Sequence, residues 1–158
     1  MSYSTIKIKL QETGEFDGQN LMLGVPFNVI DSGLSKEIVG VINSVFVLIT
    51  SPTIKYDFDI LFFNSKLQSV TENGKSLKLL ESDALNCFGK LRIESNGNMA
   101  DDYLNPVGGY YFAHLFNINL PFSGKNIVGL AVYQDGNVNK LNNNTHITIN
   151  YNFGNYVN

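Results

Sequence analysis

The strongest constraint on the fold of this chain is a two-residue alternation of apolar and polar side chains. From Ile54 to Ile60 the apolar residues occupy every second position, and lysine and aspartate fill the positions between them. The same alternation returns from Thr145 to Phe153 and, near the start, from Ile6 to Leu10. Successive side chains of a β-strand point to opposite faces, so each segment predicts a half-buried strand with one wet face.

Further segments predict strands that are more buried or interrupted. They are Leu21–Ile30, Val45–Thr50, Tyr110–Leu120 and Asn126–Tyr133. Val45–Thr50 is mostly β-branched and aromatic, which is typical of a strand covered on both faces. Pro26 restricts its strand to a sheet edge or a bulge, because proline has no amide hydrogen to donate. Gly129 predicts a bulge or a close backbone approach.

Turn signals separate these segments, and helix signals are few. The turn signals are Asp17–Gly18, Asp31–Gly33, Asn73–Gly74, Asn96–Gly97, Ser123–Gly124 and Asp135–Gly136. One short helix is expected near residues 81–88, with Ser82 or Asp83 as its N-cap and Gly89 as its stop. The pattern predicts an all-β fold, an antiparallel β-sandwich that is jelly-roll-like. We expect a single domain over residues 1–158, with an ordered core from about residue 5 to 153.

Composition argues against several classes of function. Hydrophobic residues make up 44% of the chain and charged residues 16%, which is the balance of a globular chain. The formal net charge is −3 and no basic stripe is present, so no nucleic-acid partner is expected. No apolar run approaches the ~20 residues of a membrane helix, and Met1–Thr5 does not resemble the start of a signal peptide. We expect a soluble protein that is made in a cytoplasm and has no membrane partner.

The histidines and the cysteine do not form a recognisable metal or nucleophile site. His114 and His146 are predicted on strands that could pair, but no third ligand stands at metal-binding spacing. Cys87 is the only cysteine, so no disulfide can form within the chain. It has no immediate basic neighbour that would activate its thiol, and we expect a small buried hydrophobic residue.

The carboxylates favour structural roles as well. Asp57 and Asp59 project to one face of a strand, as the carboxylate pairs of glycosidases can, yet their alternation with large apolar residues favours a solvated outer face. Asp101 and Asp102 lie in an oxygen-rich stretch, but the calcium-loop spacing that ends in glutamate is missing. We therefore expect no metal.

Motifs for covalent catalysis and phosphate binding are missing from the sequence. No Gly-x-Ser-x-Gly elbow occurs, and the adjacent glycines in Val107–Tyr110 are not followed by lysine and a hydroxyl residue. The sequence therefore indicates no catalytic, cofactor-binding or metal-binding residue, and we expect no cofactor and no enzyme activity.

Aromatic residues leave a carbohydrate-binding role open. Tyr110–Phe112 could form a platform on which a sugar stacks, although the chain has no tryptophan. The first and last residues of this run share a strand face with His114 and Phe116, and we expect that face to pack in the core. A carbohydrate-binding β-sandwich module remains an alternative, with Tyr110 or Tyr133 as contacts if they are exposed.

The order of parts from Ile54 onward resembles that of small structural proteins of tailed bacteriophages. In the first half of the pattern, a strand is followed by a short polar step, a variable loop, a short helix and a second strand. In the second half, a Leu-Pro step precedes a strand, a polar turn and a closing strand. The segments are Tyr56–Phe63, Asn64–Ser65, Leu80–Leu85, Gly89–Ile93, Asn119–Phe122, Asn126–Tyr133 and Ile147–Phe153. Asn64 stands where the family pattern has aspartate, and the pattern covers about two-thirds of the chain.

This resemblance implies a component of a virus particle. The implied role is that of an auxiliary capsid protein, which decorates or cements the head, as in phages of gut Bacteroidetes. Its implied partners are the major capsid protein or other virion proteins. We expect either a homo-oligomer, namely a trimer, or a monomer bound to the lattice. A neck, tail or head-fibre component is the alternative within the same class. Exposed strand edges and Asn-rich loops are the expected contact surfaces.

Overall fold

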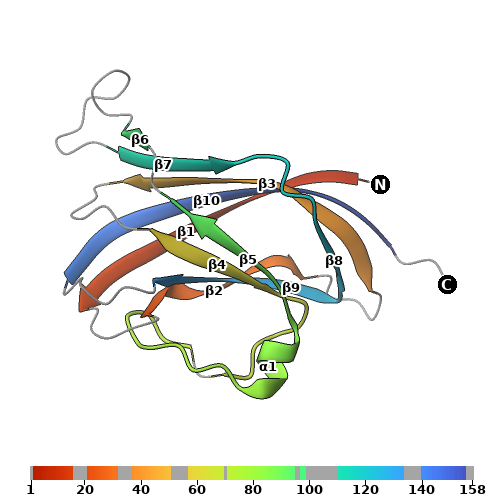
Figure 1. The fold of residues 1–158 in the computed structure, drawn as a ribbon, viewed down its shortest axis with the longest axis horizontal. Helices are drawn as coiled ribbons and strands as arrows, with labels where there is room; N and C mark the ends of the chain where they lie inside the picture. Colours follow the sequence, from red (N-terminus) through yellow and green to blue (C-terminus); the bar gives the residue numbers. More distant parts are fainter. Residues whose placement is uncertain are drawn as a thin grey trace.

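The computed structural model describes residues 2–15, 21–31, 37–50, 57–69, 71–94, 97–98, 110–133 and 140–155. In these ranges two antiparallel β-sheets face one another, and a short helix, α1 (Glu81–Leu85), lies beside them (Figure 1). The prediction of an all-β sandwich with one short helix near residues 81–88 is confirmed. None of the described helical structure is long and apolar enough to cross a membrane.

Each sheet is built from strands that are far apart in the sequence. The strands of sheet A are β1 (Ser2–Glu15), β3 (Ile38–Thr50), β6 (Gly97–Asn98), β7 (Tyr110–Leu115), β8 (Leu120–Gly124) and β10 (Lys140–Asn155). Those of sheet B are β2 (Leu21–Asp31), β4 (Phe58–Phe63), β5 (Cys87–Ile93) and β9 (Asn126–Tyr133). Sheet A has the order β1–β10–β3–β7–β6, with β8 also paired to β3, and sheet B has the order β2–β9–β4–β5. The chain therefore changes sheet at most of its connections.

The core lies between the two sheets, and the two-residue alternation decides which side chains enter it. Ile147, Ile149 and Tyr151 of β10 are buried there, as the alternation from Thr145 to Phe153 predicts. From sheet B, the buried core residues of β4 are Phe58, Ile60 and Phe62. Both sheets thus contribute to one continuous apolar layer.

A second apolar layer covers the other face of sheet B. We call residues 64–69 and 71–80, together with α1, the cover; it lies on the side of sheet B that faces away from sheet A (Figure 1). Beneath it the sheet buries Met22, Phe63, Val128, Leu130 and Val132. The cover packs Leu67, Leu77 and Leu79 against them. Most of sheet B is therefore buried on both faces, although Lys90 and Arg92 of β5 remain exposed.

The cover overturns the prediction that the strand ending at Ile60 has one wet face. Asp59, expected in solvent, is only 2% exposed, and the alternate residue Phe63 is fully buried. Polar residues in the sequence suggested an outer face, but a loop that follows β4 closes over it. Residues 51–56, which include the first half of this alternation, lie outside the described residues.

Strand β3 differs from its prediction in the opposite sense. Val45 and Val47 are buried, whereas Phe46 and Leu48 between them are only partly buried. Val45–Leu48 is thus not covered on both faces, because no layer in the described ranges packs on the outer side of sheet A. Its β-branched and aromatic composition reflects strand propensity and not two-sided burial.

The segment predicted as one strand over Tyr110–Leu120 is two strands, β7 and β8. Between them Asn117 and Asn119 have φ values of 52° and 51°, in the left-handed region that asparagine tolerates better than most residues. Both strands still pair with β3, which continues past the break.

The prediction for Pro26 is confirmed, and that for Gly129 is met in a different way. β2 is an edge strand of sheet B, and its register against β9 shifts between Leu23 and Phe27, around Pro26. Gly129 pairs with Phe27, and a Cβ at Gly129 would overlap the ring of Phe27. The close approach is made by an aromatic ring, and the bulge lies in β2.

The helix begins and ends elsewhere than predicted. Its N-cap is Leu80, with no side-chain cap, and its C-cap is Asn86 in place of Gly89. Asp83 does not act as the N-cap because its carboxylate accepts hydrogen bonds from Gln68 and Ser69 across the cover.

Two predicted turns lie wholly within the described residues: the one at Asn73–Gly74 is confirmed, whereas Ser123 and Gly124 are the last residues of strand β8. Gly74 has a φ of 80°, and the amide of Lys75 donates to the carbonyl of Glu72 at 3.1 Å. At the predicted Ser123–Gly124 turn the chain leaves β8 of sheet A and enters β9 of sheet B. The turns predicted at Asp17–Gly18, Asp31–Gly33, Asn96–Gly97 and Asp135–Gly136 lie wholly or partly outside the described residues. Strands β1 and β10 begin and end slightly outside the expected core of residues 5–153.

Replacing Gly129 with alanine tests the packing of β2 on β9. We expect Gly129→Ala to lower the free energy of unfolding by about 1–3 kcal/mol, because the added methyl group displaces the Phe27 ring. Gly154→Ala is the matched control, since its Cβ would meet nothing within 4 Å. Urea denaturation of both variants measures the difference, and equal midpoints would contradict this packing.

Candidate binding surfaces

The carboxylates Asp57 and Asp59 do not form an open pair. Asp59 lies opposite Arg92 in the register of β4 and β5, and Arg92 Nη1 is 3.4 Å from Asp59 Oδ1. The carboxylate side chain is 3% exposed and the guanidinium side chain 46% exposed, so the ion pair lies at the boundary between the cover and solvent. Asp57 precedes β4 and is partly buried. Asp59 therefore neutralises a local cation and offers no accessible acid.

Asp83 is the most strongly held carboxylate in the described ranges, and sequence analysis considered it only as a helix cap. Its Oδ2 accepts from the backbone amides of Gln68 at 3.0 Å and Ser69 at 2.7 Å, and from the hydroxyl of Ser69. The Ser69 hydroxyl oxygen in turn accepts from the amide of Leu80 at 2.9 Å. These bonds tie the first and last parts of the cover together.

The environment of Asp83 lowers the pKa of its carboxyl group. Burial alone would raise the pKa, but the Ser69 hydroxyl and the amides of Gln68 and Ser69 stabilise the ionised form, and their effect is larger. The group is 2% exposed and its acceptor positions are used within the cover. Asp83 is therefore a structural anchor.

The two histidines do not meet. β7 and β10 pair with opposite edges of β3, so His114 lies opposite Phe46 and His146 lies opposite Leu48. The intervening strand separates the histidine-bearing strands by about 10 Å, twice the usual strand spacing. In the described ranges no three histidine, cysteine or acidic side chains are grouped closely enough to hold a metal ion.

The outer face of sheet A carries an aromatic group made of the exposed His114 and Phe116 and the partly buried Phe46. The His114 and Phe116 ring centroids are 3.7 Å apart, and the Phe46 ring meets His114 edge-on at 5.4 Å. Phe116 is 68% exposed. The prediction that His114 and Phe116 share a core-facing row is therefore wrong: their neighbour Leu115 faces the core instead. An exposed aromatic group of this kind favours contact with another molecule.

The other aromatic candidates give less. Tyr133 is a candidate sugar contact only if it is exposed. It is 7% exposed, so it is not available to a sugar. The side chains of Tyr110, Tyr111 and Phe112 lie outside the described residues, as do Asp101 and Asp102. Cys87 is partly buried against the layer beneath the cover, consistent with a hydrophobic role.

Strand β1 forms an end of sheet A and is a second candidate surface. It pairs with β10 through all fourteen of its residues without a register shift. In the described ranges no second strand is hydrogen-bonded to it, although β2 packs close by, with its Gly24 against Leu10. Such an edge presents unpaired amide and carbonyl groups to a partner strand.

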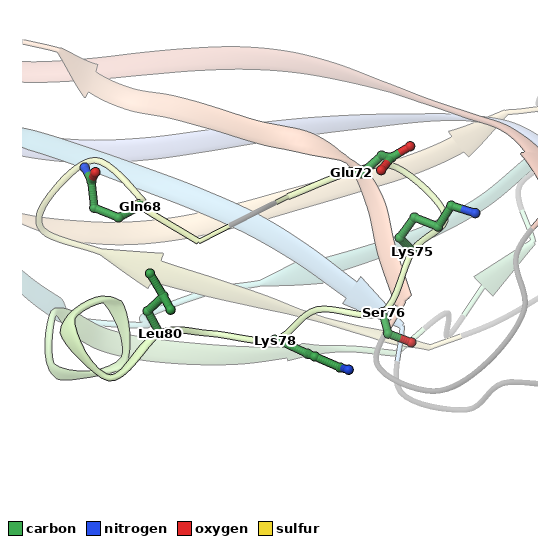
Figure 2. A pocket seen from close by; sticks show the side chains of 6 residues that line it. All are labelled: Gln68, Glu72, Lys75, Ser76, Lys78 and Leu80. Carbon is green, nitrogen blue, oxygen red and sulfur yellow. The ribbon is translucent and has the colours of Figure 1, made fainter.

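A hollow of about 340 Å³ lies within the cover, and six residues between Gln68 and Leu80 line it. Figure 2 shows Glu72 and Lys75 at one end and Gln68 and Leu80 at the other. Lys78 and Ser76 complete its lining. Charges of both signs beside one leucine do not converge on a common point, so this hollow carries no assignment to a ligand class.

The Asp83 bonds predict a pH-dependent stability. Because the pKa of Asp83 is lowered in the folded state, its ionised form stabilises the fold above pH ~4, and this contribution is lost as pH falls through the folded-state pKa. We expect Asp83→Asn to cost about 1–3 kcal/mol at pH 7 and progressively less below pH ~4. Denaturation of both proteins across this range measures it, with exposed Glu81→Gln as control. A cost that does not change with pH would contradict the account.

Comparison with known proteins adds no family to this geometry. No protein-family model matches the chain, and no curated protein matches its sequence. The case for a function therefore rests on the fold, the aromatic group and the edge of β1.

Proposed function

We propose that this chain is a non-enzymatic structural protein of a bacteriophage particle, an auxiliary capsid protein that decorates or cements the head by binding the lattice of the major capsid protein. The observation that carries the proposal is the order of the strands. β1–β10–β3–β7 in one sheet face β2–β9–β4–β5 in the other, and most consecutive strands lie in different sheets. This alternation matches the connectivity of a jelly roll, an architecture used by viral capsid and lectin domains.

We infer a jelly roll from this strand order. Because that fold serves several functions, the surfaces of the molecule must supply further support. The cover buries most of the outer face of sheet B, whereas the outer face of sheet A carries the exposed His114 and Phe116 beside the partly buried Phe46. Sheet A also ends in the long edge of β1. We expect each single contact through these surfaces to be weak. A repetitive lattice raises the overall affinity when the bound copies are linked to one another.

The proposal predicts that the protein is present in purified virus particles. Quantitative mass spectrometry of particles from the culture in which the gene is expressed is expected to find the chain in a fixed ratio to the major capsid protein. Hundreds of copies per particle support a place on the shell. About a dozen copies instead support the alternative, a neck, tail or head-fibre component. The absence of the chain from purified particles would overturn both.

A carbohydrate-binding module is the second candidate, and the exposed aromatic group favours it. Phe116 is accessible for stacking against the apolar face of a sugar ring. If this candidate is right, a glycan array binds the wild-type protein, and Phe116→Ala loses that binding by about tenfold, the equivalent of ~1.4 kcal/mol. Leu85→Ala is the matched control, because Leu85 is 79% exposed on α1, outside the aromatic group. No binding by the wild-type protein removes this candidate.

A further inference from the structure

The ends of the two sheets are protected unequally. β2 contains Pro26 and two register shifts, and its Met22 exchanges backbone hydrogen bonds with Gly74 and Lys75 of the cover at 2.8 and 2.9 Å. β5 is seven residues long and has a register shift at Phe88, and β6 is two residues long. Proline, bulges, short length and coverage are the usual devices that keep an edge strand from pairing with another chain.

β1 lacks most of these devices. It is fourteen residues long, contains no proline, and keeps one register against β10 from Ser2 to Glu15. Its charges are distributed unevenly: Lys7 and Lys9 stand in its first part, and Glu12 and Glu15 in its last part. Both lysines are exposed on the outer face of sheet A. Lysine on an edge opposes pairing with another cation, yet it favours pairing with an acidic segment.

We propose that β1 pairs antiparallel with β1 of a second copy of this chain, which joins two A sheets into one continuous sheet across a two-fold axis. Antiparallel pairing places the lysine part of one strand beside the glutamate part of the other. A second copy of β1 therefore brings its glutamates beside the lysines of the first copy, and its lysines beside the glutamates. This inference does not rest on the proposed place in a virus particle, and its test can fail independently.

Symmetry and charge together select the register. Residues directly opposite in an antiparallel pair point to the same face, so a two-fold axis perpendicular to the sheet pairs odd positions with odd positions. A centre at Lys9 would place the two copies of Lys9 face to face, which is unfavourable. A centre at Gln11 places Lys7 opposite Glu15 of the second copy, and Lys9 opposite Thr13. The favourable pair occurs twice in the dimer because the axis repeats it.

Sedimentation velocity over a range of protein concentrations tests this interface. The wild-type protein is expected to form dimers, and Lys7→Glu and Glu15→Lys are each expected to weaken dimerisation by about tenfold or more, since each places like charges opposite one another at two symmetric positions. The double variant Lys7→Glu with Glu15→Lys is expected to restore it. Lys66→Glu is the matched control, because Lys66 is an exposed lysine in the cover, outside β1.

Glu15 also lies opposite Lys140 within its own sheet, so the thermal midpoint of each variant is measured in parallel. Hydrogen exchange adds a second readout: backbone amides of β1 are expected to become more protected as the dimer forms. A wild-type protein that stays monomeric at its highest soluble concentration would overturn the proposal. So would a dimer that the single charge reversals leave unchanged, or one that the double reversal fails to restore.

Discussion

The fold depends on the contact between the inner faces of the two sheets. β10 supplies Ile147 and Ile149 from the middle of sheet A, and β4 supplies Phe58, Ile60 and Phe62 from the middle of sheet B. All of them are fully buried, and burial of each such side chain contributes about 1.5–3 kcal/mol relative to an exposed position. Because these strands pair with neighbours from distant parts of the chain, forming this layer also fixes the strand order. The other features of the molecule are arranged around it.

The two outer faces have different consequences for function. On sheet B the cover adds leucines and the Asp83 hydrogen bonds, which turn that side into a second buried layer. On sheet A the described residues add no such layer, and Phe46, His114 and Phe116 remain on the surface beside strands that end in the open edge of β1. We propose that the cover stabilises one side of the molecule and that the exterior of sheet A binds partners. It is the physical reason to look for partners on sheet A.

Local alternation predicted much of the fold, but it could not predict what covers a strand. The inner row of β10 and the edge position of β2 followed from period-two patterning and from Pro26. The burial of Asp59 could not be predicted from this patterning, because it depends on a loop that follows β4 and folds back over the sheet. Asp83 was missed for the same reason: its partners, Gln68 and Ser69, lie fourteen or more residues earlier. The outward position of Phe116 depends on β7 and β8 sharing β3 as a partner, which no local pattern contains.

The central claim is that this protein acts through the exterior of sheet A, and cryo-microscopy of purified particles tests it most directly. The account predicts density for the sandwich on the particle, in which the aromatic group or the edge of β1 touches a neighbouring subunit and the cover points away from the contact. Density in which the cover makes the contact, while the aromatic group and β1 both face solvent, would contradict it.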